Sequence, residues 1–521
     1  MKEFLNEVIE CIKYIEVNDF NMLKTKEDLL NRYFDEMDEK SKLNCLSLIK
    51  GNGRETILIL SYLLQVIKNS IIQTSIEEVL LEEDLSVLNV LNVLLQMNNY
   101  LFRVPIERDE KGHYQRQQRI MQNQIERIYK TLKYNYRYVP YEKRNSQKVI
   151  LMCRTFLGKT HAPTAKIVNI CRYLEKLGYE TCVLCTYMGD IEKNSLGQWY
   201  NTYVENCKFA STGSFNVNYF GVQVKGYVMY YTSENFYDVT SETLQIIKEY
   251  NPLFVLDVGG NNIFSCLAEQ FTTVCSMACV KTPPLTTVSV VARYFQYTDE
   301  ENKKFIECLN EKQTVLDMVH VDELAVSLNK LHRKCDYGLK EDTFVILIAG
   351  NRLDDEITKQ FQVILHKILE QQENVTIVFI GRCYKLQQVI VKDSFAERYK
   401  FIGEVDDFKG IMKIGDLFLN PPRQGGGTGA YYAIANEVPV LTLPNCDVAQ
   451  VGDGFTCKSL EEMPKIIDKY IHNNKFMEYQ KDYCKKRTKI LYGVDNIGNI
   501  KKFIDNLEKV VLKNENANKI K

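Results

Sequence analysis

The stretch NPPRQGGGTGAYYAIANEVPVLTLP, at 420–444, combines residue types that suit the binding of a diphosphate. Its successive glycines remove the Cβ atoms that would keep an oxyanion away from the backbone. A threonine there could cap a helix or donate its hydroxyl, and an arginine adds a permanent charge whose fork matches phosphate oxygens. A helix that starts in such a loop presents free N–H groups and the positive end of its dipole. The candidate ligands are Arg423, Gly425, Gly426, Gly427, Thr428 and Gly429.

A tight turn would explain two of these glycines equally well. Three in succession, with an arginine before them and a threonine after them, favour a phosphate site. No GK[ST] follows, as a Walker loop would require, and the pattern is not GxGxxG. The loop therefore gives no support to ATP hydrolysis or to hydride transfer.

A second candidate loop, FLGKTHAPTAKIV, places His161 at a loop-to-helix junction beside Pro163, a residue suited to a first helical turn. A neutral imidazole, with an ordinary pKa near 6.5, could accept a proton or hydrogen-bond a phosphate. A lone histidine is nevertheless more often structural. LDVGGNN, at 256–262, follows another apolar run, and its glycines fit a tight turn as well as a binding loop.

Apolar runs alternate with helical patterns around these loops. RNSQKVILMCRTFLGKTHAPTAKIVNICRYLEKLGYETCVLCTY predicts a strand, a helix and a second strand, which is the repeating unit of a parallel sheet. A second series begins near residue 340 with DTFVILIAGNRLDDEITKQFQVILHKILEQQENVTIVFIG. The fold class is therefore α/β, with two doubly wound, Rossmann-like domains whose ligands bind beyond the carboxyl ends of the strands.

About 140 residues with helical periodicity precede these domains, and 521 residues are too many for one core. We predict a helical N-terminal domain at 1–145, α/β domains at 146–335 and 336–495, and a closing helix and tail at 496–521. One helix, RQQRIMQNQIERIYKTLKYNY, has an apolar stripe flanked by basic residues. It would either pack on the next domain with a solvated face or recruit an acceptor.

The composition excludes several classes of protein. The charges nearly cancel, at 66 basic and 67 acidic residues, which argues against a chain built to neutralise nucleic acid. No apolar run approaches the length of a membrane span, and the N-terminus lacks a secretory apolar region, so we expect a cytoplasmic protein without an integral membrane segment.

The cysteines and the acidic pairs carry no chemistry that we expect to matter. Cys182 and Cys185 form the chain's CxxC, which lies within an apolar run typical of a buried strand rather than a redox helix. The acidic segments LDDE, at 353–356, and VDDF, at 405–408, read as solvated or helix-capping residues. We therefore predict reduced cysteines, no metal site and no cofactor.

The segment GDLFLNPPRQGGGTGAYYAIANEVPVLTLP, followed by DVAQVGDGF, resembles the nucleotide-sugar site of GT-B glycosyltransferases. It is most similar to the O-linked N-acetylglucosamine transferases and the bacterial cytoplasmic protein glycosyltransferases. The resemblance covers residues 150–510, although only this C-terminal stretch is specific. It implies a GT-B fold in which the C-terminal domain holds a nucleotide-diphosphate sugar, with UDP the expected nucleotide, and the other α/β domain holds the acceptor.

The resemblance also implies roles for residues outside the glycine loop. IAGNRLDDEITKQF matches the first strand, loop and helix of the donor domain, where Arg352 and Lys359 would meet the diphosphate. The segments FIGRCYKL, FIGEVDDF and NCDVAQVGDGF supply the expected nucleotide and sugar ligands, Arg382, Glu404 and Asp447. On the acceptor side His161 is the implied catalytic group, and the residues around it are Lys159, Thr160, Asp257, Gly259, Gly260 and Asn261.

The chain departs from the family in ways that leave alternatives open. The paired glutamates of many retaining enzymes are missing, since Glu437 stands alone before the VPVLTLP run, and this favours an inverting transferase. A retaining transferase for lipid or polysaccharide, a sugar-nucleotide epimerase and a non-catalytic accessory subunit remain alternatives. The basic helix favours a protein or peptide acceptor, and assembly with itself or with another chain stays open.

Overall fold

The computed structural model describes the chain except for residues 18, 50–52, 83, 105, 133–136, 159–160, 190–210, 220, 296, 320–330, 445 and 520–521. Two compact units make up the chain. The first comprises residues Met1–Met318 together with Ile500–Lys521, and the second comprises Val319–Asn499. The helical segment predicted as a domain of its own packs within the first unit. Each unit is described by itself below.

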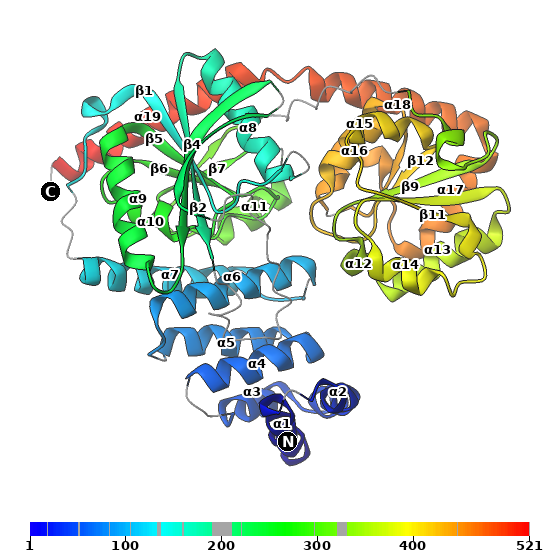
Figure 1. Cartoon of the computed structure of the whole chain (residues 1–521), viewed down its shortest axis with the longest axis horizontal. Helices are drawn as coiled ribbons and strands as arrows, with labels where there is room; N and C mark the ends of the chain where they lie inside the picture. Colours follow the sequence, from blue (N-terminus) through cyan, green and yellow to red (C-terminus); the bar gives the residue numbers. More distant parts are fainter. Residues whose placement is uncertain are drawn as a thin grey trace. The chain divides into compact units, whose positions relative to one another are not determined.

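Seven helices open the first unit (Figure 1). Polar side chains cap several of them: Asp19 accepts the Met22 N–H, and Asp38 accepts the Ser41 N–H. The helices bury a continuous apolar core against one another. They are α1 (Lys2–Glu16), α2 (Phe20–Asp35), α3 (Glu39–Ser47), α4 (Gly53–Ile67), α5 (Ser70–Glu82), α6 (Val87–Arg103) and α7 (Glu110–Leu132).

The sheet of the first unit has eight strands in the order β3-β4-β2-β1-β5-β6-β7-β8. All neighbours are parallel except the β3–β4 hairpin, which the sequence analysis did not identify. The strands are β1 (Asn145–Cys153), β2 (Glu180–Met188), β3 (Gly213–Tyr219), β4 (Val222–Tyr231), β5 (Pro252–Val258), β6 (Val274–Met277), β7 (Val290–Arg293) and β8 (Thr314–Asp317). The helices between them are α8 (Ala162–Lys176), α9 (Phe236–Tyr250), α10 (Ile263–Ala268) and α11 (Asp299–Glu307).

The basic helix of the sequence analysis is α7, and it packs on the α/β part of the same unit. Its apolar stripe is buried, as Met121, Ile125 and Ile128 show. Tyr114 Oη donates to the Pro283 carbonyl at 2.9 Å, and Gln118 Nε2 donates to the Thr286 carbonyl at 3.2 Å. Helix α7 therefore joins the helices to the loop before β7.

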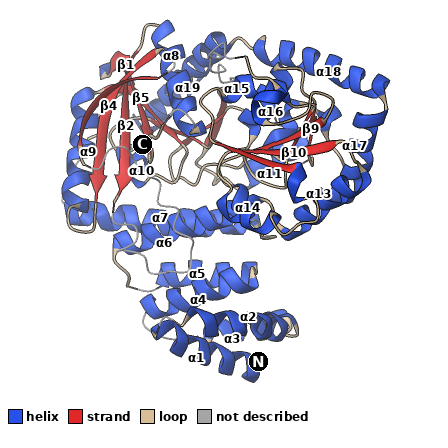
Figure 2. Cartoon of the chain, turned by 45° about the vertical axis from the view of Figure 1, so that its right-hand side comes forward, coloured by secondary structure: helices blue, strands red, loops and turns tan. Residues whose placement is uncertain are grey.

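The second unit contains a five-stranded, fully parallel sheet in the order β11-β10-β9-β12-β13. Two of its strands, β9 and β10, are labelled in Figure 2. The strands are β9 (Phe344–Ala349), β10 (Val375–Ile380), β11 (Tyr399–Gly403), β12 (Leu417–Leu419) and β13 (Val440–Leu441). The helices are α12 (Leu353–Glu356), α13 (Lys359–Gln371), α14 (Tyr384–Ile390), α15 (Phe408–Ile411), α16 (Gly427–Ala435), α17 (Met463–His472) and α18 (Asn474–Tyr492). Among the described residues of both units, the short 3-10 helices are Tyr141–Lys143, Lys334–Tyr337, Ala396–Arg398, Met412–Ile414, Asp447–Val451, Asp453–Phe455 and Leu460–Glu462.

The last helix, α19 (Asn496–Lys519), returns to the first unit, to which residues 500–521 belong. Phe503 is 1% exposed and meets Phe254 of β5 edge to face, with ring centroids 6.2 Å apart. Near the other end of the helix, Glu515 Oε1 accepts the Tyr141 N–H at 2.9 Å. These contacts hold α19 against the sheet of the first unit.

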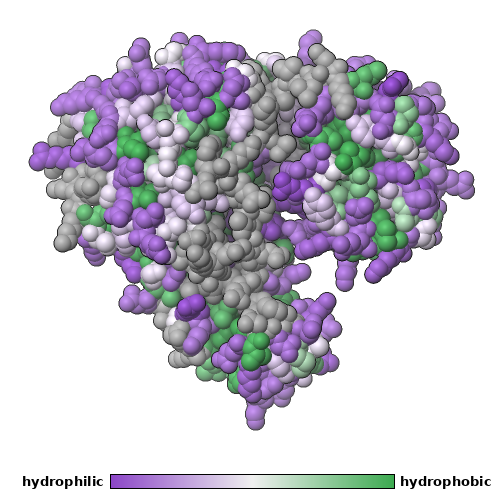
Figure 3. Space-filling model, in the orientation of Figure 1, coloured by the Kyte–Doolittle hydropathy of each residue, from purple (hydrophilic) through white to green (hydrophobic). Residues whose placement is uncertain are grey.

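The predicted fold class, two Rossmann-like α/β parts after a helical segment, is confirmed. Cys182 and Cys185 are buried free thiols in β2, as expected. Within the described residues, no helix has the length and apolarity needed to cross a membrane. Figure 3 shows a largely hydrophilic face, with some apolar side chains at the surface of the N-terminal helices. Exposed apolar residues of those helices include Ile9, Met22 and Leu43.

Replacing Phe503 with alanine is expected to destabilise the first unit by about 3 kcal/mol, because a buried aromatic ring leaves a cavity between α19 and β5. Lys502→Ala, at the exposed neighbouring position, should change the free energy of unfolding by less than about 0.5 kcal/mol. Urea denaturation followed by circular dichroism measures both. Equal effects of the two substitutions would mean that α19 does not stabilise the unit through this contact.

Candidate functional site

The glycine loop leaves the carboxyl end of β12 and leads directly into α16. Gly425 and Gly426 both have φ of +84°, a backbone conformation that disfavours any other residue. The N-cap is Gly426, and Thr428 is the exposed second residue of the helix. The expectation that Thr428 could cap the helix is therefore wrong, although its hydroxyl can still donate. The N–H groups of the first turn, at Gly427 and Thr428, have no partner within the helix.

Arg423 is buried beneath this loop and is not an exposed cation. Its side chain is 3% exposed, and its three nitrogens all donate to protein oxygens. Nε donates to Asn420 Oδ1 at 2.7 Å, Nη1 to Glu356 Oε2 at 2.7 Å, and Nη2 to the Ala349 carbonyl at 2.9 Å. In this structure Arg423 positions the loop, and its contact with a diphosphate stays a prediction.

Glu356, at the end of α12, is a residue that the sequence analysis missed. Its side chain is 5% exposed, so the expectation of a solvated or capping carboxylate is wrong for this position. It is correct for Asp354, whose Oδ1 accepts the Leu386 N–H at the start of α14. Glu356 binds two arginines, because Oε1 also accepts from Arg352 Nη2 at 2.8 Å. A sequence signal was present, since Arg352 and Glu356 are four residues apart.

Arg352 and Asp447 both contact the glycine loop itself. Arg352 Nη2 donates to the Gln424 carbonyl at 2.8 Å, and its side chain keeps 25% of its surface exposed. Asp447 Oδ2 accepts the Gly425 N–H at 2.7 Å. Lys359 is exposed in the first turn of α13. The structure thus brings the first two of these predicted ligands to the loop.

Arg382 and Glu404 lie just beyond the carboxyl ends of β10 and β11. They form an ion pair with each other, with Arg382 Nε 3.0 Å from Glu404 Oε1. Both side chains are about half exposed, at 51% and 44%. The pair sits at the same edge of the sheet as the glycine loop, and its contact with a base or ribose stays a prediction.

In the first unit, His161 is the N-cap residue of α8, following β1. Its Nδ1 lies 2.8 Å from Thr164 Oγ1, which also accepts the Leu157 N–H at 2.9 Å. This arrangement favours donation from the Thr164 hydroxyl to Nδ1, which leaves the ring hydrogen on Nε2. Burial lowers the pKa of His161 to about 4, so the imidazole is neutral at neutral pH.

Of the other acceptor-side candidates, Lys159 and Thr160 lie outside the described residues. Gly259, Gly260 and Asn261 form a tight turn after β5, each with positive φ. A Cβ on Gly260 would come within 2.7 Å of Pro284 Cβ, and the Asn261 N–H donates to the Leu285 carbonyl at 2.7 Å. The turn is therefore packed closely on the 283–286 loop.

Asp257, the remaining candidate, is fully buried at the end of β5. Its Oδ2 accepts from Ser276 Oγ at 2.8 Å, while Oδ1 has no partner among the described residues. Burial raises the pKa of Asp257 to about 7, and the Ser276 hydrogen bond opposes this only in part. A cavity of about 20 Å³, large enough for one water, is lined nearby by Arg154, Asn261 and Asn262.

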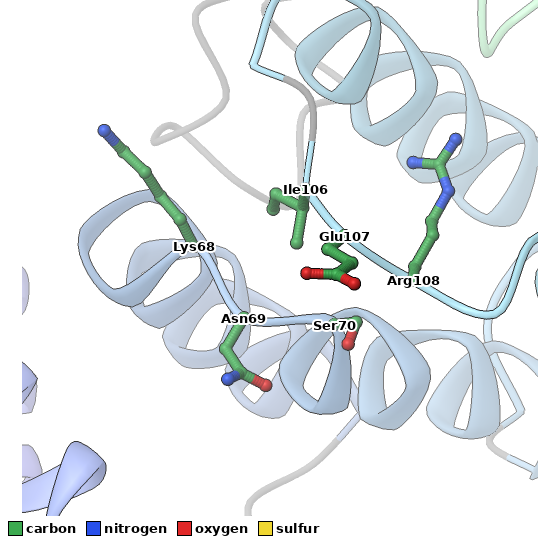
Figure 4. A pocket seen from close by; sticks show the side chains of 6 residues that line it. All are labelled: Lys68, Asn69, Ser70, Ile106, Glu107 and Arg108. Atoms are coloured by element: carbon green, nitrogen blue, oxygen red, sulfur yellow. The ribbon is translucent and has the colours of Figure 1, made fainter.

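A larger hollow, of about 500 Å³, lies among the N-terminal helices (Figure 4). Its lining residues are Lys68, Asn69, Ser70, Ile106, Glu107 and Arg108, none of which the sequence analysis selected. Arg108 is paired with Glu110 at 3.0 Å. Nowhere in the described ranges do three or more His, Cys, Asp or Glu side chains form a group that could hold a metal ion.

Comparison with solved structures identifies the class of fold. A mutant O-GlcNAc transferase from Thermobaculum terrenum superimposes with a TM-score of 0.51 at 10% identity, covering 98% of each chain. HepE from Anabaena in complex with UDP gives 0.47 at 15% identity, over 70% of this chain and 100% of its own. No family model matches the chain, and no curated protein matches it. The chain has the GT-B fold, as the likeness to the O-GlcNAc transferase indicates, so the resemblance stated from the sequence is confirmed at the level of the fold.

Gly426→Ala and Gly427→Ala form a matched pair that tests the loop. Alanine at 426 should destabilise the second unit by about 1–2 kcal/mol or more, because φ is +84° and its Cβ would lie 2.6 Å from Arg423 Nε. Alanine at 427 has no atom closer than 3.7 Å and should be close to neutral. Chemical denaturation of the variants measures the difference. A Gly426→Ala protein as stable as Gly427→Ala would contradict this loop conformation.

His161 should make stability depend on pH between about 6.5 and 4. The folded chain keeps the imidazole neutral where the unfolded chain would protonate it, so this contribution is present above about pH 6.5 and is lost as the pH falls towards 4. We expect His161→Gln to lose less stability than wild type between pH 7 and pH 5. His472→Gln, at a side chain 64% exposed, serves as the control. Equal losses in wild type and His161→Gln would show that burial does not hold His161 neutral.

Proposed function

We propose that the chain is a glycosyltransferase that moves a sugar from a nucleotide-diphosphate donor, with UDP as the nucleotide, to an acceptor. One observation carries the proposal. Helix α16 begins at a turn after the carboxyl end of β12, in which two glycines adopt the left-handed backbone conformation. The N–H groups of its first turn have no partner within the helix. In a GT-B fold such a helix end suits a diphosphate. The likeness of the whole chain to an O-GlcNAc transferase agrees with this.

The chemical task is to stabilise the leaving diphosphate as the anomeric carbon becomes oxocarbenium-like. The N–H groups of Gly427 and Thr428 have a fixed direction before the charge develops, which is the most effective form of electrostatic stabilisation. Arg352, partly exposed beside the loop, adds a positive charge. These groups supply the stabilisation without a metal ion. The lone Glu437 favours an inverting displacement.

His161 is the proposed catalytic group on the acceptor side. With its pKa lowered to about 4, the imidazole is a weak base and does not hold a second proton at neutral pH. With its hydrogen on Nε2, it is instead suited to donate a hydrogen bond to an acceptor or donor oxygen. We therefore assign it the role of orienting the acceptor rather than that of removing its proton.

We propose a protein or peptide as the acceptor and the cytoplasm as the place of action. The helical segment supports this, because it packs in one unit with the α/β part that carries His161. A charged hollow of about 500 Å³ among those helices adds a polar surface to the same unit.

A panel of nucleotides and nucleotide sugars tests the proposal by thermal shift. At a hundred times its Kd, UDP should raise the unfolding midpoint of the second unit by about 5 °C or more. The shift should persist in EDTA, since no metal is invoked. Adenine and guanine nucleotides serve as controls and should give smaller shifts. If no uridine nucleotide or nucleotide sugar raises the midpoint, the donor site is wrongly assigned.

A further inference from the structure

Glu356 joins the two loops that define the donor end of the second unit. One loop follows β9 and contains Arg352, and the other follows β12 and contains Arg423. Strands β9 and β12 are neighbours in the sheet. The Glu356 carboxylate accepts from Arg352 with one oxygen, at 2.8 Å, and from Arg423 with the other, at 2.7 Å. A single buried carboxylate thus ties both loops together.

The backbone around this carboxylate leaves room for it. A Cβ on Gly350 would lie 2.5 Å from Arg423 Nη1 and 3.3 Å from Glu356 Oε2. A Cβ on Gly426 would lie 2.6 Å from Arg423 Nε. One glycine from each loop therefore lies close against the Arg423 guanidinium. This close approach shows that the loops are shaped around the ion pair.

Arg352 and Arg423 differ in solvent exposure, which indicates that they have different roles. Arg423 is 3% exposed and uses Nε, Nη1 and Nη2 on protein oxygens, so it fixes the loop from below. Arg352 is 25% exposed and donates a hydrogen bond to the Gln424 carbonyl. Gln424 directly precedes the two glycines with positive φ. Asp447, on the other side, holds the Gly425 N–H. The accessible cation of this network is Arg352.

We infer that Glu356 is a positioning residue for diphosphate recognition. It orients Arg423, which fixes the start of α16, and it holds Arg352 at the loop surface, where that guanidinium meets the diphosphate. A buried carboxylate between two guanidiniums is suited to such a task because it fixes geometry more than it adds stability. The inference rests on the proposed function, since it concerns the same donor end.

The test compares the affinities of UDP and UMP for the wild type and for Glu356→Gln by isothermal titration calorimetry. The amide keeps the size of the side chain but removes its charge, and its NH2 group cannot accept from a guanidinium, so the side chain no longer holds both arginines. We expect the UDP affinity to fall about tenfold or more while the UMP affinity changes little, which lowers the ratio of the two. Glu370→Gln, at an exposed position of α13, is the control and should keep the wild-type ratio.

Glu356→Asp keeps the charge and shortens the side chain by one methylene, and it provides a second variant if Glu356→Gln does not fold. Its UDP-to-UMP ratio should lie between those of wild type and Glu356→Gln. Equal losses for UDP and UMP, or a wild-type ratio in a folded variant, would overturn the inference and leave Glu356 a structural residue. If the wild type binds neither nucleotide, the proposed function fails instead.

Discussion

Parallel strand pairing brings candidate residues of each unit to one edge of its sheet. A parallel neighbour can be reached only by a crossover connection, so each strand of the second sheet releases its loop at the same edge. Residues far apart in the sequence are thereby brought together, as Arg352 and Gln424 are, through a hydrogen bond of 2.8 Å. The first sheet obeys the same rule for the loops after β1 and β5. In each unit the candidate residues of these loops therefore lie at the edge of the sheet where the strands have their carboxyl ends.

The two units each bury a carboxyl group at that edge, with opposite electrostatic surroundings. Glu356 lies between two guanidiniums, which compensate a negative charge directly. Asp257 accepts a hydrogen bond from the Ser276 hydroxyl, and burial raises its pKa to about 7. The first carboxylate therefore orders the two guanidiniums at the glycine loop. The second is suited to a neutral, hydrogen-bonded role beneath the turn at Gly259 and Gly260.

The sequence predicted the fold better than it predicted the tasks of individual charges. Apolar runs, helical periodicity and glycines report local structure, so the strands around both loops were found. The β3–β4 hairpin was missed, although alternating residues on either side of Gly221 could have indicated it. Burial is not local, and this is why Glu356 was interpreted as solvated or helix-capping and its ion pair with Arg423 was not predicted. Only the sheet order, which places β9 beside β12, brings that carboxylate to that guanidinium.

The helical segment contributes to the first unit in a way that periodicity could not show. The 283–286 loop is contacted from two sides: α7 donates to it from Tyr114 and Gln118, and the turn after β5 packs on it. Asn261, at φ +53°, keeps its strained conformation while its N–H donates to the Leu285 carbonyl. The shape of the turn after β5 is therefore set jointly by the sheet and by the helices. The helical segment and this α/β part therefore form one compact unit.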